Sequence, residues 1–160
     1  MSIKTTLTLA AVATGLGLSG AALAASHGDD HGHEERAERA LVILTSDSLQ
    51  TQGMAMILAN AMQQQGTTLQ ILLCDAAGDL GLEGYSSEGI NTPPGHPMEQ
   101  VTPEAIMQMM MREGASVDVC AIYLPNSDHG EDDLREGVGV AAPGPMAEMM
   151  RDPTIPVFSF

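Results

Sequence analysis

Two cysteines are the side chains best suited to covalent chemistry in this sequence of 160 residues. Cys74 ends one apolar run, beside Asp75, and Cys120 lies inside another, between Val119 and Ala121. A cysteine thiolate can act as a nucleophile or be oxidised to a disulfide, whereas a cysteine in an apolar strand is often an inert, small hydrophobic residue. Both interpretations stay open for each cysteine.

Three histidines, His27, His31 and His33, lie among carboxylates near the start of the chain. Imidazole and carboxylate groups bind Cu(II), Ni(II) and Zn(II), and thioethers with thiolates bind Cu(I). The sequence has twelve methionines, so copper or zinc is a candidate ligand of the histidine segment, alone or with Cys and Met side chains. The alternative is a solvated tail that binds no metal, and no other cofactor is expected.

Residues 1–24 have the pattern of a secretory signal peptide. Lys4 supplies a basic start, residues 7–23 are mainly apolar, and residues 22–24 form a small-residue cleavage site. Glycine, serine and threonine interrupt the apolar run, which is short for a membrane span of about 20 residues. We expect a mature chain that begins at Ala25, is exported or periplasmic, and does not contact the membrane after cleavage.

The charge of the chain excludes several classes of function. Its formal net charge is −15, and Lys4 is its single lysine. A mature chain without lysine cannot form a Schiff base or use a P-loop lysine. Acidic surfaces repel phosphate backbones, and only 2% of the residues are aromatic, so few side chains can stack on bases. Nucleic acid is not an expected partner.

The remaining sequence predicts one α/β domain after a polar tail. Residues 25–39 show no apolar periodicity, whereas residues 40–160 alternate apolar runs with helical patterns. Strands are expected at residues 41–44, 69–74, 117–124, 138–141 and 155–160, and helices before Gly66, between Thr102 and Gly114, and between Pro145 and Pro153. Such alternation favours right-handed crossovers, hence a three-layer fold with a mainly parallel five-stranded sheet and helices on both faces. A long irregular connection is expected at residues 75–97.

Helical spacing also predicts which methionines are buried. In the first helix, Met54, Leu58 and Met62 share one face with other apolar residues, and this face should pack on the sheet. Met56 lies off that face, and Met109 lies off the apolar face of the second helix. Each of these two is expected to be exposed or buried in a subunit contact.

An exported protein with two cysteines invites a disulfide, but the expected strand order argues against one. In doubly wound sheets the strands that carry Cys74 and Cys120 usually flank the first strand. Two strand spacings amount to about 9.5 Å. A disulfide tolerates a Cα separation of about 7 Å. The pair should therefore be unlinked unless a loop moves. His129, beside Asp128, is a candidate base for Cys120.

The order of the motifs resembles the DsrE/DsrF-like family, small α/β sulfur-relay proteins with the YchN-like fold. The segments that carry the resemblance are residues 41–65, the strand that ends in Asp75, the strand at residues 117–120, and residues 137–160. Cys120 stands where sulfur-carrying members have their cysteine. The resemblance implies that Cys120 accepts sulfane sulfur as a persulfide. Cys74 is expected at the carboxyl end of its strand, where open α/β sheets have their ligand crevices, and is a candidate to receive or resolve the persulfide.

The resemblance also implies a homo-oligomer, a trimer or hexamer, and a protein that donates or accepts the sulfur. Two other functions stay open. One is an exported metal-binding module that uses the histidine segment, and the other is a structural oligomer whose cysteines are inert.

Overall fold

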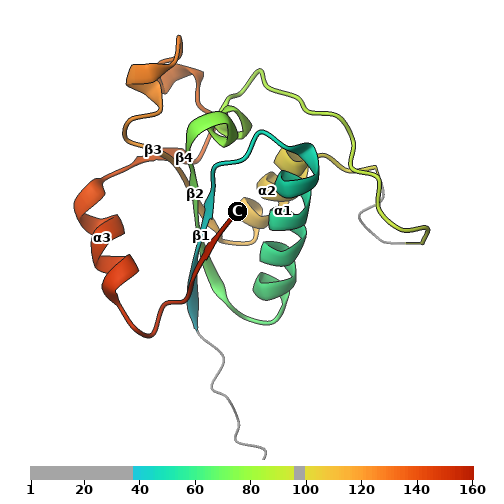
Figure 1. Cartoon of the computed structure of the whole chain (residues 1–160), viewed down its shortest axis with the longest axis horizontal. Helices are drawn as coiled ribbons and strands as arrows, with labels where there is room; N and C mark the ends of the chain where they lie inside the picture. Colours follow the sequence, from blue (N-terminus) through green and yellow to red (C-terminus); the bar gives the residue numbers. More distant parts are fainter. Residues whose placement is uncertain (1–37, 96–99) are drawn as a thin grey trace, which may run out of the picture. The chain divides into compact units, whose positions relative to one another are not determined.

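Five strands form one sheet in the computed structural model, which describes residues 38–95 and 100–160 (Figure 1). The strands are β1 (Arg39–Leu44), β2 (Thr68–Leu73), β3 (Ser116–Cys120), β4 (Val138–Ala141) and β5 (Val157–Ser159). Their order is β4-β3-β2-β1-β5, and every neighbouring pair is parallel. The predicted parallel five-stranded sheet is confirmed. The expected signal peptide and most of the expected tail lie outside the described residues.

Helices cover both faces of this sheet, as predicted. Helices α1 (Leu49–Gln64) and α2 (Pro103–Arg112) lie on one face, and α3 (Pro143–Arg151) lies on the other (Figure 1). Thr102 caps α2 by accepting a hydrogen bond from the Ala105 amide at 3.3 Å. Proline at the first turn of a helix adds a fixed φ there, which explains the start of α2 at Pro103.

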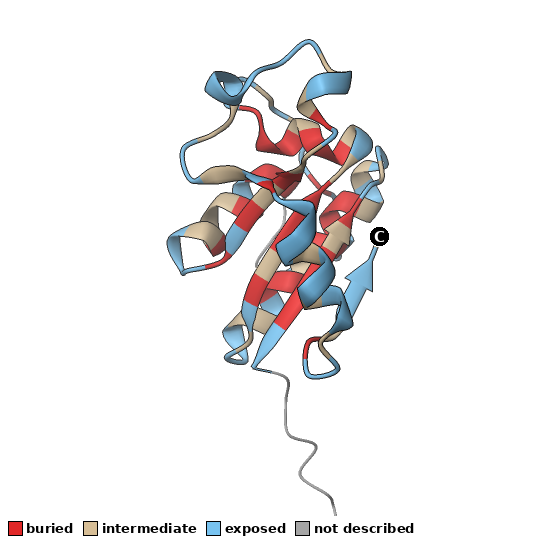
Figure 2. Cartoon of the chain, turned by 90° about the vertical axis from the view of Figure 1, so that its left-hand side faces the viewer, coloured by how far each residue is buried: buried red, intermediate tan, exposed pale blue. Residues whose placement is uncertain are grey.

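Alternating residues of the strands build two separate cores. Val42, Ile71 and Val117 belong to the core beneath α1 and α2. Leu41 and Leu72 belong to a smaller core on the α3 face. Successive side chains of a strand point to opposite faces, so a strand buried on both faces is apolar throughout. Figure 2 shows the buried residues along the strands, whereas α3 has no buried residue.

The predicted buried face of α1 is wrong for Met54 and Leu58. Met54 and Leu58 are 53% and 44% exposed, whereas Met56 is fully buried. Small residues face the sheet and the segment around Ile90 instead. A Cβ on Gly53 would lie 2.7 Å from the side chain of Ile90. Close packing on small residues therefore decides the rotation of α1 and leaves Met54 and Leu58 exposed. Ile57 and Met62 are half-buried against the core.

The expectation for Met109 is also corrected. Its side chain is half-buried and packs against the core beneath α1 and α2. Neither Met56 nor Met109 needs a subunit contact to be covered. The core of the single chain accounts for both.

The connection after β2 is more ordered than the sequence predicted. Its first part forms a short 3-10 helix, η1 (Asp75–Gly81). Further along, Ile90 packs on α1, and Glu104 of α2 accepts hydrogen bonds from the amide and hydroxyl of Ser87 at 3.0 and 2.6 Å. The described part of this connection is thus tied to α1 and α2.

The third strand is shorter than predicted, because it ends at Cys120 instead of residue 124. The chain then turns through η2 (Leu124–Asn126) and η3 (Glu131–Asp133), two short 3-10 helices. After β4 it crosses the α3 face to β5, at the opposite edge of the sheet. This last crossover places β1 between β2 and β5.

Candidate functional site

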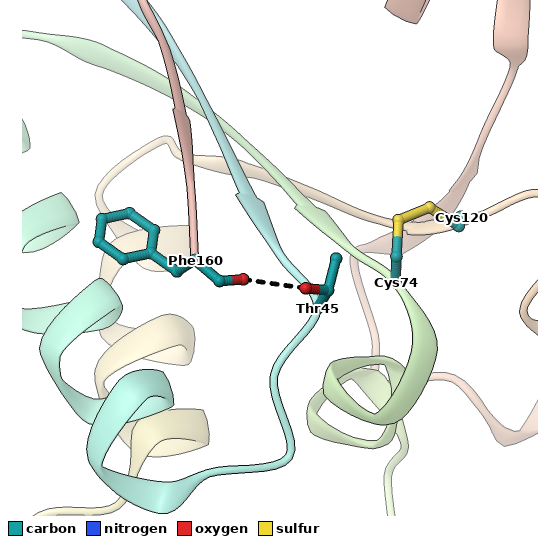
Figure 3. The surroundings of a disulfide bond; sticks show 4 residues. All are labelled: Thr45, Cys74, Cys120 and Phe160. Atoms are coloured by element: carbon teal, nitrogen blue, oxygen red, sulfur yellow. Dashed lines mark hydrogen bonds between the residues drawn. A yellow bond between two sulfur atoms is a disulfide. The ribbon is translucent and has the colours of Figure 1, made fainter.

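The two cysteines lie side by side at the carboxyl ends of neighbouring strands. Leu73 and Val119 are the last residues that pair between β2 and β3, and Cys74 and Cys120 follow them directly. Their Cα atoms are 5.1 Å apart, and a disulfide joins them (Figure 3). The predicted wide separation is wrong, because β1 lies on the far side of β2 and not between the two cysteine strands.

The disulfide occupies the edge of the sheet where parallel α/β folds bind ligands. The Cys74 amide donates a hydrogen bond to the Leu44 carbonyl at 2.9 Å, so the pair is level with the end of β1. At the same edge the Thr45 hydroxyl donates to the Phe160 carbonyl at 3.1 Å (Figure 3). The connection after β2 leads to α2 on one face of the sheet, and the connection after β4 leads to α3 on the other face. Crevices form where connections from one edge diverge to opposite faces.

Both cysteines are half-buried on the α3 face, where they pack against the smaller core. Their sulfur atoms are therefore neither sealed inside the protein nor fully solvated. The geometry suits a site with controlled access.

A second contact holds the two cysteine segments together. The Tyr123 hydroxyl donates a hydrogen bond to Asp79 Oδ1 at 2.7 Å, which links the turn after β3 to η1. The Tyr123 ring lies against Gly78, where a Cβ would come within 2.3 Å of it. Burial, with the Asp79 carboxylate beside it, raises the pKa of Tyr123. The phenol therefore stays a donor. These contacts of Tyr123 with Gly78 and Asp79, here called the Tyr123 clamp, do not depend on the disulfide.

The backbone turns sharply immediately after Cys74. Asp75 has a φ of +52°, in the left-handed region that aspartate adopts more readily than most residues. The chain leaves the plane of the sheet at that point and enters η1, and the Ala77 amide donates to the Cys74 carbonyl at 3.2 Å. Cys74 is consequently the last extended residue of its strand.

An apolar cavity of about 200 Å³ borders Cys120. None of the residues that line it carries a charge; they are Leu72, Cys120, Ala121, Ile122, Ala141, Pro143 and Met146. The cavity lies between the end of β3, the end of β4 and the first turn of α3. A group that reacts with the Cys120 sulfur from this side meets hydrocarbon surface.

His129 does not line the cavity beside Cys120. It lines a separate cavity of about 620 Å³, together with Asp79, Leu82, Glu83, Gly84, Tyr85, Asp132 and Asp133. Its Nδ1 lies 3.8 Å from Asp133 Oδ2. This contact does not join His129 to Cys120, and the role of His129 as a base for Cys120 stays a prediction.

The metal prediction lies largely outside the described residues, since His27, His31 and His33 belong to residues 1–37. Within residues 38–95 and 100–160, no group of three or more His, Cys, Asp or Glu side chains could hold a metal ion. The same part of the chain contains no helix long and apolar enough to cross a membrane. Copper or zinc binding by the histidine segment stays a prediction.

The sequence did not reveal the partners of the cysteines. No local pattern marks Gly78, Asp79 and Tyr123 as neighbours, although Tyr123 is one of only two tyrosines and closely follows Cys120. An aromatic residue in a chain with so few, placed three residues after a candidate nucleophile, is the signal that could have found it.

The fold and the cysteine pair define a small α/β protein with a parallel sheet and a disulfide at its carboxyl edge. Solved structures with the same fold are the YchN protein from E. coli, with a TM-score of 0.54 and 18% identity, and MTH1491 from Methanobacterium thermoautotrophicum, a protein of unknown function, with 0.55 and 14%. Each match covers 76% of this chain, with 99% of YchN and 98% of MTH1491. The predicted YchN-like fold is confirmed. No protein-family model and no curated protein matches the sequence.

Proposed function

We propose that this protein carries sulfane sulfur as a persulfide on Cys120 and that Cys74 resolves the persulfide by closing the disulfide. The observation that carries the proposal is the pairing of the two cysteines across β2 and β3, with Cα atoms 5.1 Å apart. Two thiols at this distance exchange readily between a dithiol and a disulfide.

The proposed cycle begins with the reduced pair. The Cys120 thiolate attacks the outer sulfur of a donor R–S–SH, so that Cys120–S–SH forms and the thiolate R–S⁻ leaves. An acceptor thiolate can then take the outer sulfur, which returns Cys120 as a thiolate. If no acceptor arrives, the Cys74 thiolate attacks the Cys120 Sγ, the disulfide forms, and HS⁻ leaves. Two external thiols reduce the disulfide and are themselves joined as a disulfide.

The assignment of the carrier to Cys120 rests on two points. Cys120 stands where sulfur-carrying proteins of the resembling family have their cysteine, and it alone of the two borders the apolar cavity. A persulfide there would be shielded on one side from water. Cys74, beside the exposed Asp75, is placed to attack it from the neighbouring strand.

Export and a partner complete the proposal. A disulfide between half-buried cysteines is typical of proteins in oxidising compartments, which supports an exported or periplasmic location. In such a compartment the closed pair is the resting form, so a thiol donor must open it before sulfur is loaded. A protein that donates or accepts the sulfur is part of this cycle.

We also infer a homo-oligomer, in line with the trimers or hexamers that the resemblance implies. Met54 and Leu58 of α1 are exposed apolar residues, and so is Phe158 of β5. Phe158 pairs with Val42 in register, so its side chain points to the face that α1 covers. A second subunit on this side of the sheet would bury all three.

Sulfide release tests the cycle. Reduced wild-type protein, freed of reductant and mixed with a small organic persulfide, should release sulfide and regain the disulfide. The Cys74→Ser variant should load sulfur but release little sulfide, and the Cys120→Ser variant should load none. Equal sulfide release from all three proteins would contradict the proposal, because the cysteines would then play no part.

A further inference from the structure

The cavity beside Cys120 has a size and surface that restrict what can react there. Its volume is about 200 Å³, below the range of about 300 to 1,000 Å³ that suits drug-sized ligands. An apolar protein cavity of about 150 Å³ takes up benzene. The space beside Cys120 therefore fits a substituent of a few carbon atoms.

The lack of charged side chains at the cavity further restricts which molecules can react there. No residue that lines the cavity has a charged side chain, so nothing there would pair with a carboxylate or sulfonate. The whole chain has a formal net charge of −15, which repels anionic thiols at long range. Ile122 is 73% exposed at this cavity, which opens it to solvent beside the reactive sulfur.

We propose that the small-molecule thiols and persulfides that react with Cys120 carry a short, uncharged and apolar substituent, which occupies this cavity. The inference rests on the proposed function and adds the substrate class. The two external thiols that reduce the disulfide react in turn. The first thiolate R–S⁻ attacks Cys120 Sγ, the R–S–Sγ bond forms, and Cys74 leaves as a thiolate. A second thiolate then attacks the R–S sulfur, so that R–S–S–R forms and Cys120 is released as a thiolate.

The test compares three thiols on the oxidised full-length protein. They are 1-butanethiol, the uncharged and hydrophilic 2-mercaptoethanol, and the anionic 3-mercaptopropionate. Each rate is divided by the rate at which the same thiol opens a small model disulfide, because thiolate concentration and intrinsic nucleophilicity both differ between thiols. The rate of disulfide opening should be about tenfold higher for butanethiol than for mercaptoethanol, the factor expected from two further buried carbon groups. Mercaptopropionate should be slowest.

Two variants separate the cavity from the overall charge. Ile122→Glu adds a carboxylate at the cavity, and Met150→Glu adds one at an exposed site of α3 that does not line it. Ile122→Glu should abolish the preference for butanethiol over mercaptoethanol, whereas Met150→Glu should preserve it. Both residues are mainly exposed, so neither change should unfold the protein.

Equal rates for butanethiol and mercaptoethanol in the wild type would overturn the inference, as would equal loss of preference in both variants. If no thiol opens the disulfide, the inference also fails. Sulfur loading of chemically reduced protein decides the proposed function separately. Loading without thiol selectivity leaves the carrier function in place and removes only the substrate class.

Discussion

Tyr123 connects the two segments that carry the cysteines. It contacts Gly78 with its ring and Asp79 with its hydroxyl, so η1 and the turn after β3 are held together beside the disulfide. A methyl group on Gly78 would enter the Tyr123 ring, whereas a methyl group on Gly84 would meet no atom within 4 Å. This difference gives a matched pair of substitutions.

The Gly78→Ala variant should be less stable by about 1–3 kcal/mol, because overpacking forces Tyr123 or the backbone to move. The Gly84→Ala variant should change the free energy of unfolding by no more than about 0.5 kcal/mol, as is usual at open surface positions. Urea unfolding of the oxidised proteins measures both. Equal stability of the two variants would show that Tyr123 does not pack tightly on Gly78.

Glu104 gives a pH-dependent prediction. Burial acts to raise the pKa of Glu104, but the hydrogen bonds from Ser87 and Thr102 outweigh it and hold the pKa below its ordinary value. The pKa of Glu104 is lower in the folded protein than in the unfolded chain, so the ionised side chain stabilises the fold. This stabilisation is fully present above the ordinary pKa of about 4.3. It is lost as the pH falls through the folded pKa.

The Glu104→Gln variant should therefore be less stable than wild type by about 1–2 kcal/mol near neutral pH, the difference between a charged and a neutral hydrogen-bond acceptor. The difference should shrink below about pH 4. Thermal unfolding across this pH range measures it, with Glu88→Gln in the exposed part of the same connection as the control. A deficit that stays constant with pH would contradict the assigned role of the Glu104 charge.

At the scale of elements, the disulfide joins the ends of β2 and β3 across 46 residues of chain. A cross-link of this span restricts the unfolded chain. Reduction, or the Cys74→Ser substitution, should lower the free energy of unfolding by about 2–4 kcal/mol. The β-sheet should persist, since β2 and β3 remain paired and the Tyr123 clamp remains.

Circular dichroism and urea unfolding with and without reductant check this prediction. The expected result is an unchanged spectrum with a lower unfolding midpoint. Loss of the folded spectrum on reduction would mean that the disulfide is essential to the fold, which a site that cycles between dithiol and disulfide cannot be.

The elements themselves were predictable, but their rotation and order were less so. Apolar runs such as residues 41–44 specify a strand locally, and Thr102 with Pro103 specifies a helix start. The rotation of α1 depends on how closely Gly53 approaches Ile90, which no local pattern encodes. Met54 and Leu58 are therefore exposed, although their helical spacing predicts burial.

The cysteine pair was missed for a reason of topology. Whether β3 lies beside β2 or across β1 depends on which way each crossover turns along the sheet, and right-handed crossovers allow both. The carboxyl-edge location of Cys74 was predicted because it follows from the strand alone. Its contact with Cys120 required the strand order β4-β3-β2-β1-β5.

At the scale of the whole molecule, the exposed apolar surface of α1 and β5 tests the inferred oligomer. Leu58→Glu should dissociate the assembly, because an unpaired carboxylate would be buried in the contact. Met150→Glu, on the opposite face of the sheet, should leave the assembly intact. Light scattering after size-exclusion chromatography distinguishes the two. A monomeric wild-type protein would contradict the inferred subunit contact.

The most direct test of the central claim is the intact mass of the Cys74→Ser protein, reduced, treated with a sulfane sulfur donor and then mapped by peptide. Without the resolving thiol, the persulfide should accumulate. The account predicts a gain of one sulfur atom located on Cys120 and removed by reductant. An unchanged mass, with Cys120 still a free thiol, would contradict the claim and leave the Cys74–Cys120 pair as a structural disulfide.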